Sequence, residues 1–226
     1  MLIALTYWQV ITIVHFNDSR FNKINMKNSL LLVFTLFYSL VFSQDLTVER
    51  IWKNYEFSPK RIGGFKSMND GEYYTNVKDG NSIYKFSLKD VNDKGAVVLD
   101  GAKLMMDGKK LTFDDYEFNF DETKILFMTS IVPIYRRSFT AVYYLYDLTT
   151  KQLMPLDEKH QPQSLAEYSP DGNSVSFIHG NDIFVKQVAN GKVVKLTEDG
   201  KRNKIINGTT DWVYEEEFSI TKGYDW

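Results

Sequence analysis

The chain has 226 residues, with 27 Lys and Arg against 29 Asp and Glu and a formal net charge of −2. This balance argues against a nucleic-acid-binding surface, because a surface that follows phosphates needs a basic excess. The sequence contains no Cys, which excludes disulfides, thiolate metal sites and a Cys nucleophile. Its three His residues lie far apart, and none forms a pair with metal-ligand spacing. We therefore expect neither a metal nor another cofactor.

The N-terminal region is typical of targeting rather than of a folded domain. Met26 and Lys27 precede an apolar run over 30–42, and a small residue follows at Ser43. This pattern predicts a signal helix, a signal peptide over 26–43, and hence a secreted or periplasmic protein. An uncleaved N-terminal membrane anchor is the alternative. Residues 1–25 are interpreted as a spurious upstream extension, with Met26 rather than Met1 as the true start; a second membrane segment is the competing interpretation.

Residues 44–60 are expected to form a separate N-terminal segment. The stretch Asp45–Trp52 predicts a short helix, with Asp45 or Thr47 as its cap. We expect Ile51 and Trp52 of this helix to pack inward.

From residue 61 onward the chain repeats one plan of strands and turns. Turn acids recur at Asp70, Asp121 and Asp171, with separations of 51 and 50 residues. Asn190-Gly191 and similar turn pairs separate alternating runs, a pattern typical of β-hairpins. A period of about 50 residues with three to four strands per unit indicates β-propeller blades. An antiparallel sandwich with accidental regularity is the alternative.

The predicted strands fall into three groups, one for each expected blade. They lie at 72–75, 82–86 and 96–99, at 124–128, 140–146 and 152–154, and at 174–178, 182–186 and 193–196. Three such units cannot close a ring, because propellers need roughly four to eight blades. The predicted fold class is therefore all-β, an incomplete β-propeller of about three four-stranded blades over 61–226.

Three consecutive carboxylates, Glu215–Glu217, lie near the C-terminal end beside Trp212, Tyr214 and Phe218. A solvated acidic patch is the ordinary interpretation of such a run. The aromatic neighbours argue for partial burial, where an uncompensated carboxylate costs about 1–3 kcal/mol. Carboxylates held in such a setting usually face a cation, so we expect this segment to bind one.

Asp211–Phe218 closely resembles a segment of the dipeptidyl peptidase IV-like proteins in the prolyl oligopeptidase family. The approach over Ile205–Trp212 is similar as well. Further upstream, Tyr135–Ala141 resembles the family's loop with a substrate-binding arginine, and Asp147-Leu148 follows it. The resemblance covers about residues 46–226. The glutamate motif is specific, whereas turns such as Ser169–Gly172 are shared by many propellers.

The resemblance implies roles for individual residues. The family's paired glutamates, which hold the free amino terminus of the substrate, fall on Glu216 and Glu217, and Glu215 lies outside the pair. The substrate-binding arginine falls on Arg136, although Arg137 replaces what is more often a histidine or another residue, which leaves an ambiguity between the two arginines. The resemblance also implies an eight-bladed N-terminal propeller followed by an α/β-hydrolase domain with a Ser–Asp–His triad.

That hydrolase domain is missing from this sequence, in which no Gly-x-Ser-x-Gly elbow occurs. We therefore expect truncation before the catalytic domain, no catalytic residues in this chain and no activity from the chain alone.

Paired glutamates suit the recognition of a free amino terminus. Two carboxylates can accept two of the three N–H donors of an ammonium group, and an internal peptide would leave them unpaired. Because adjacent residues diverge by about 100° on a helix, we expect an irregular or short helical turn over 213–218, anchored by Trp212 and Phe218. Arg136 would donate to the carbonyl of the substrate's second residue.

The leading prediction is the propeller portion of a secreted serine exopeptidase that releases N-terminal dipeptides after proline or alanine. Its expected partners are a peptide with a free N-terminus and the hydrolase domain. Formation of a homodimer is left as an open alternative, and binding of nucleic acid is not expected. A stand-alone β-propeller binding module without catalytic activity is the alternative.

Overall fold

The computed structural model describes residues 46–59 and 64–226, which belong to two compact units divided after Lys60. In the first unit, a helical turn, η2 (Glu49–Lys53), follows Thr47, whose Oγ1 accepts the Arg50 N–H at 3.2 Å. The residue directly before the turn is Val48, which provides no side-chain cap, so Thr47 contacts the turn from one position further away. The inward packing predicted for Trp52 is wrong: its side chain is 70% exposed, because the described part of this unit buries none of the helical residues.

The predicted signal peptide over 26–43 and the upstream extension over 1–25 lie outside the described residues. Among the described residues, no helix has the length and the apolar character needed to cross a membrane.

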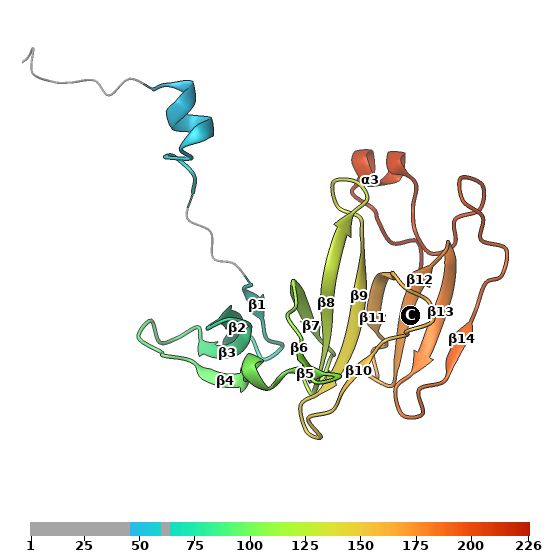
Figure 1. Cartoon of the computed structure of the whole chain (residues 1–226), viewed down its shortest axis with the longest axis horizontal. Coiled ribbons are helices and arrows are strands. Elements are labelled where there is room, and N and C mark those ends of the chain that lie inside the picture. Colours follow the sequence, from blue (N-terminus) through green and yellow to red (C-terminus); the bar gives the residue numbers. More distant parts are fainter. Residues whose placement is uncertain (1–45, 60–63) are drawn as a thin grey trace, which may run out of the picture. The chain divides into compact units, whose positions relative to one another are not determined.

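Three four-stranded antiparallel sheets make up the second unit (Figure 1). The first contains β1 (Lys66–Ser67), β2 (Tyr73–Lys78), β3 (Ser82–Ser87) and β4 (Ala96–Leu99). The second contains β7 (Asp115–Phe118), β8 (Lys124–Pro133), β9 (Phe139–Asp147) and β10 (Leu153–Pro155), and the third contains β11 (Ser164–Tyr168), β12 (Ser174–His179), β13 (Asp182–Gln187) and β14 (Val193–Lys195). Consecutive strands are neighbours in each sheet, as in propeller blades. The predicted fold class, an all-β incomplete propeller, is confirmed.

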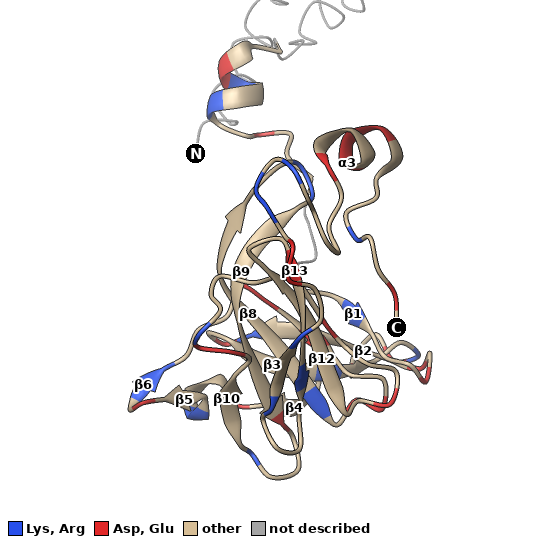
Figure 2. Ribbon diagram, turned by 90° about the vertical axis from the view of Figure 1, so that its right-hand side faces the viewer, with Lys and Arg blue, Asp and Glu red and all other residues tan. Residues whose placement is uncertain are grey.

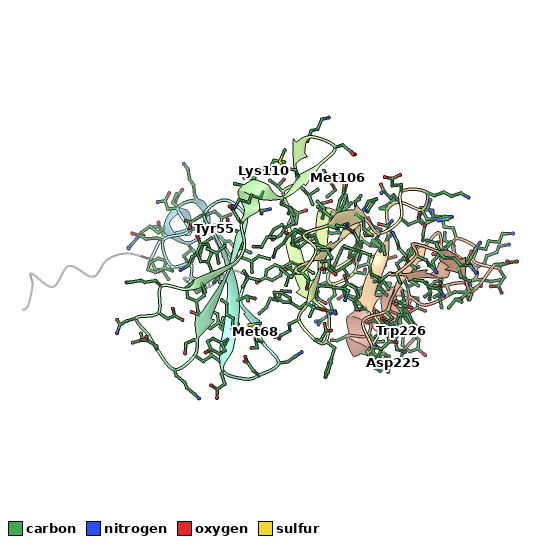
Figure 3. The ribbon with its side chains drawn as sticks, turned by 90° about the horizontal axis from the view of Figure 1, so that it is seen from below. Tyr55, Met68, Met106, Lys110, Asp225 and Trp226 are labelled. Atoms are coloured by element: carbon green, nitrogen blue, oxygen red, sulfur yellow. The ribbon has the colours of Figure 1, made fainter. Side chains whose placement is uncertain are left out.

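The sequence prediction missed the first strand of every sheet. β7 and β11 each bury only one residue, Tyr116 and Ala166, so charged and polar neighbours hide their strand character. It also missed a small hairpin of β5 (Met105–Met106) and β6 (Lys109–Lys110), and the 3₁₀ turn η3 (Gly101–Lys103). Figure 3 shows Met106 and Lys110 on this hairpin, well apart from Trp226 at the C-terminal end.

The repeated turn acids have a common structural role. In Asp70, Asp121 and Asp171, Oδ1 accepts the N–H two residues further along the chain, at 2.9, 3.2 and 3.0 Å. Asp171 also accepts the Ser169 hydroxyl at 2.6 Å, and this bond, with those from Asn173, lowers the pKa of the Asp171 carboxyl to about 2. The period seen in the sequence thus arises because each tight turn needs a side-chain acceptor.

Two apolar clusters lie between neighbouring sheets. Ile83 of the first sheet and Phe127 of the second, both fully buried, belong to one cluster. Tyr143 of the second sheet and Phe177 of the third, 1% and 0% exposed, belong to the other. Burying a side chain of this kind stabilises the fold by about 1.5–3 kcal/mol, so these clusters hold the three blades together.

A polar cluster around Asp182 ties β13 to the segment that follows the third sheet. Its carboxylate accepts bonds from Lys195 Nζ at 2.8 Å, from Thr197 Oγ1 and Gly200 N at 2.9 Å, and from Asn207 Nδ2 at 3.2 Å. Burial by itself raises the pKa of this carboxyl, but the opposite effect of these partners is larger, and the pKa falls to about 2. The chain therefore leaves the third blade along a fixed path.

Candidate functional site

The β8–β9 hairpin carries the predicted arginine at its tip. The predicted strands at 124–128 and 140–146 leave a long loop between them, but β8 continues to Pro133, so that only residues 134–138 connect the two strands. A register shift between Thr129 and Val132 allows the longer pairing. The prediction of a long loop is therefore corrected: Arg136 stands at the end of a paired hairpin.

The acidic run lies on a short regular helix, α3 (Trp212–Phe218). Asp211 caps it, because Oδ1 accepts the Tyr214 N–H at 3.0 Å, and Ser219 ends it in the left-handed conformation. The predicted short helical turn is present. The irregular turn that was the other expectation is not observed over these residues.

The helix sits on a loop whose two ends are paired. Thr209 and Lys222 form an antiparallel bridge, and the Gly223 N–H donates to the Gly208 carbonyl at 2.9 Å. Lys222 Nζ also contacts both carboxylate oxygens of Glu167, each at 2.9 Å. This stem fixes the base of the α3 loop on the third sheet.

Glu215 joins α3 to the hairpin tip of the second sheet. Its Oε1 accepts the backbone N–H groups of Arg137 at 2.7 Å and of Ser138 at 2.9 Å, and the residue is only 2% exposed. Burial by itself raises the pKa of this carboxyl. The hydrogen bonds from Ser138 and Arg137 and the positive charge of Arg137 have a larger, opposite effect, so the pKa lies below its usual value. Glu215 is therefore held as a buried carboxylate. Figure 1 shows α3 beside the β8–β9 end of the sheets.

Glu216 and Arg136 form an ion pair, with Nε of the arginine 3.3 Å from Oε2 of the glutamate. The Glu216 side chain is 16% exposed, whereas that of Arg136 is 71% exposed. Glu217 is exposed, and no described residue forms a hydrogen bond or ion pair with its carboxylate. Figure 2 shows the acidic residues of α3 at the same end of the sheets as basic loop residues. Arg136 and Glu216 thus meet between the hairpin tip and α3, and Glu217 follows Glu216 on the same helix.

The aromatic side chains do not anchor α3 as predicted. Trp212 and Phe218 are 52% and 63% exposed, and Tyr214, which contacts the Phe218 ring, is 52% exposed. The carboxylate of Glu215 is the buried anchor instead. Hydrophobic periodicity could not have found it, because it would bury the aromatic residues and leave the acids in solvent.

A cleft of about 340 Å³ lies between the hairpin tip, the α3 loop and the third sheet. Its lining includes Tyr135, Arg137, His179, Arg202 and Glu215. Arg136, Glu216 and Glu217 do not line this cleft. Within the described ranges, no three His, Asp or Glu side chains gather as a metal site requires.

The fold defines the class of this chain: it is part of a β-propeller, with an acidic helix inserted after its third blade. Residues 119–226 match the family model for the dipeptidyl peptidase IV (DPP IV) N-terminal region. Over these residues the chain is similar to the N-terminal region of dipeptidyl peptidase IV-like proteins.

Relatives of known sequence and structure support the same assignment. The chain is 39% identical over 93 residues to prolyl endopeptidase FAP of Bos taurus and 40% identical over 103 residues to dipeptidyl peptidase 4 of Sus scrofa. These matches cover 41% and 45% of this chain but only 12% and 13% of the relatives. The crystal structure of Porphyromonas gingivalis dipeptidyl peptidase 4 matches 79% of this chain and 25% of that one, with a TM-score of 0.71 and 31% identity. The chain thus spans a minor part of the length of each relative.

Proposed function

We propose that this chain is the propeller portion of a serine exopeptidase that releases N-terminal dipeptides after proline or alanine. Glu216 and Glu217 bind the amino terminus of the substrate, and Arg136 binds the carbonyl of its second residue. The observation that carries the proposal is the pairing of Arg136 with Glu216 at 3.3 Å beside the exposed Glu217. A generic propeller blade has no need of this arrangement.

The ion pair gives the site a way to exchange partners. An arginine that is 71% exposed holds a carboxylate by only about 0–1 kcal/mol. An incoming ammonium can therefore take over Glu216 and donate a second charge-assisted hydrogen bond to Glu217. Arg136 is then released toward the peptide carbonyl, which positions the scissile bond.

An endopeptidase is the second candidate function, because three similar proteins are named prolyl endopeptidase. The two candidates differ in one requirement. An exopeptidase of this design needs a positive charge at the amino terminus, because an uncharged end leaves both carboxylates unpaired. An endopeptidase accepts a blocked or extended chain.

The test compares two substrates of the full-length protein, a dipeptide anilide with proline in the second position and its N-acetylated form. We expect the free-amine substrate to be cleaved with a kcat/KM at least about tenfold higher, since a lost charged hydrogen bond costs about 1.5–3 kcal/mol. Equal cleavage of both forms would favour the endopeptidase, and cleavage of neither would favour a non-catalytic binding module.

Three further features belong to this proposal. The catalytic triad lies in an α/β-hydrolase domain outside this sequence, the protein is exported through a signal peptide over 26–43, and the assembled enzyme forms a homodimer. Amino-terminal sequencing of the exported protein tests the second feature, with Gln44 expected as the first residue. Light scattering coupled to size-exclusion chromatography tests the third.

A further inference from the structure

We propose that Glu215 is a positioning residue that holds α3 against the β8–β9 hairpin and thereby places Glu216 and Glu217 for amine binding. This inference rests on the proposed function, but the contact on which it depends can be measured without any activity. It also gives the first glutamate of the run a role different from those of its neighbours.

The geometry at Glu215 is that of a fixed link. One oxygen, Oε1, accepts two successive backbone N–H groups, of Arg137 at 2.7 Å and of Ser138 at 2.9 Å, across separations of 78 and 77 residues. The residue is 2% exposed, so its charge is withdrawn from water. A buried carboxylate is tolerated only when such partners satisfy it. The link therefore has a defined geometry and is difficult to exchange for solvent.

The other contacts of the helix are weaker or more distant. Its aromatic side chains Trp212 and Phe218 are exposed, and the stem at Thr209 and Lys222 holds only the base of the loop. The Arg136–Glu216 pair reaches the same hairpin, but its arginine lies mostly in solvent, where ion pairs are weak. Among the described contacts, Glu215 is the buried one that fixes α3 to the second sheet.

The position of Glu215 in the run determines where the next two carboxylates stand. Each residue of a helix is rotated by about 100° from the last, so fixing Glu215 against the hairpin fixes the directions of Glu216 and Glu217. Loss of the link leaves the helix free to tilt on its stem. The amine-binding carboxylates then lose their register with Arg136, while the blades themselves stay folded.

The experiment compares three substitutions in the full-length protein. Glu215→Gln keeps an Oε1 acceptor for both N–H groups, Glu215→Asp shortens the side chain by one methylene, and Glu215→Ala removes the acceptor. Glu198→Ala, at an exposed glutamate on the segment after β14, is the matched control. Two measurements are made: hydrogen exchange of peptides that span 134–140, and KM and kcat on a free-amine dipeptide anilide.

We expect Glu215→Ala and Glu215→Asp to speed exchange over 134–140 and to raise KM about tenfold with a smaller change in kcat. Glu215→Gln should keep the exchange rate and KM close to those of the wild type, and Glu198→Ala should change neither the exchange rate nor KM. Unchanged exchange in Glu215→Ala overturns the link, and this holds even if the protein shows no dipeptide release and the proposed function fails. Faster exchange with an unchanged KM, or a fall in kcat alone, overturns the positioning role, because a merely structural defect lowers the active fraction.

Discussion

The Ser138 N–H donates to Glu215 Oε1 at 2.9 Å, although the two residues are 77 positions apart in the chain. One belongs to the hairpin tip of the second sheet, and the other to a helix inserted after the third. Their contact brings Arg136 and Glu216 within 3.3 Å of each other. The candidate site is therefore assembled from two blades, and neither blade contains it alone.

The two arginines at the hairpin tip should have unequal effects. Arg136→Ala removes the guanidinium that pairs with Glu216 and, in the proposed function, binds the substrate carbonyl. We expect kcat/KM on a dipeptide anilide to fall about tenfold to a hundredfold. Arg137→Ala should cost less than about threefold, because Arg137 reaches Glu215 through its backbone N–H, which the substitution keeps. Steady-state kinetics of both variants measure these effects. A larger loss of kcat/KM in Arg137→Ala than in Arg136→Ala would show that Arg136 is not the substrate-binding arginine.

The stem of the α3 loop should affect binding more than stability. Lys222→Met removes the contact with both oxygens of Glu167, whose side chain, like that of Lys222, is about one-third exposed or less. Such a pair contributes roughly 1 kcal/mol, so the melting temperature should change by only a few degrees. We expect KM for a free-amine substrate to rise several-fold, because the base of the loop loosens. A large loss of stability with normal KM in the folded protein would show that the stem serves the blade rather than the site.

Asp182 should make the stability of the protein pH-dependent. Its folded pKa, about 2, lies below the unfolded value of about 3.9. The carboxylate therefore contributes stability that is present above the unfolded pKa and is lost as pH falls through the folded one. Asp182→Asn should lower the free energy of unfolding by about 2 kcal/mol at neutral pH, and the difference from the wild type should shrink between about pH 4 and 2.

Asp107→Asn is the control for this measurement, because Asp107 is exposed on the small hairpin and its backbone φ of 50° suits asparagine. Denaturant unfolding at several pH values measures both variants. A difference between Asp182→Asn and the wild type that does not depend on pH would contradict the assigned cause.

The fold could be predicted from the sequence because its repeat has a local cause. Asp70, Asp121 and Asp171 recur since each accepts a backbone N–H in the turn that it begins. The outer strands β7 and β11 could not be predicted, because one buried residue each gives no alternation. Their position depends on pairing with β8 and β12, which is decided by tertiary contacts.

The roles of the site residues stay predictions, and the sequence did not indicate how α3 is held in place. The resemblance implies roles for Glu216, Glu217 and Arg136, and the structure pairs Arg136 with Glu216 and places Glu217 next to Glu216 on α3. It gave Glu215 no role, and the aromatic flank pointed to the wrong anchor. The burial of Glu215 results from two backbone N–H groups 77 and 78 residues away, and no pattern within α3 encodes them.

Binding of the amino terminus by Glu216 and Glu217 is tested most directly by the kinetics of Glu216→Ala and Glu217→Ala in the full-length protein, with Glu198→Ala as the exposed control. We predict that each of the first two substitutions lowers kcat/KM on a free-amine dipeptide anilide by about tenfold or more, because a charged hydrogen bond to the ammonium is lost. The control should stay within about twofold of the wild type. Unchanged kinetics in both Glu216→Ala and Glu217→Ala would contradict the claim that these carboxylates bind the amino terminus.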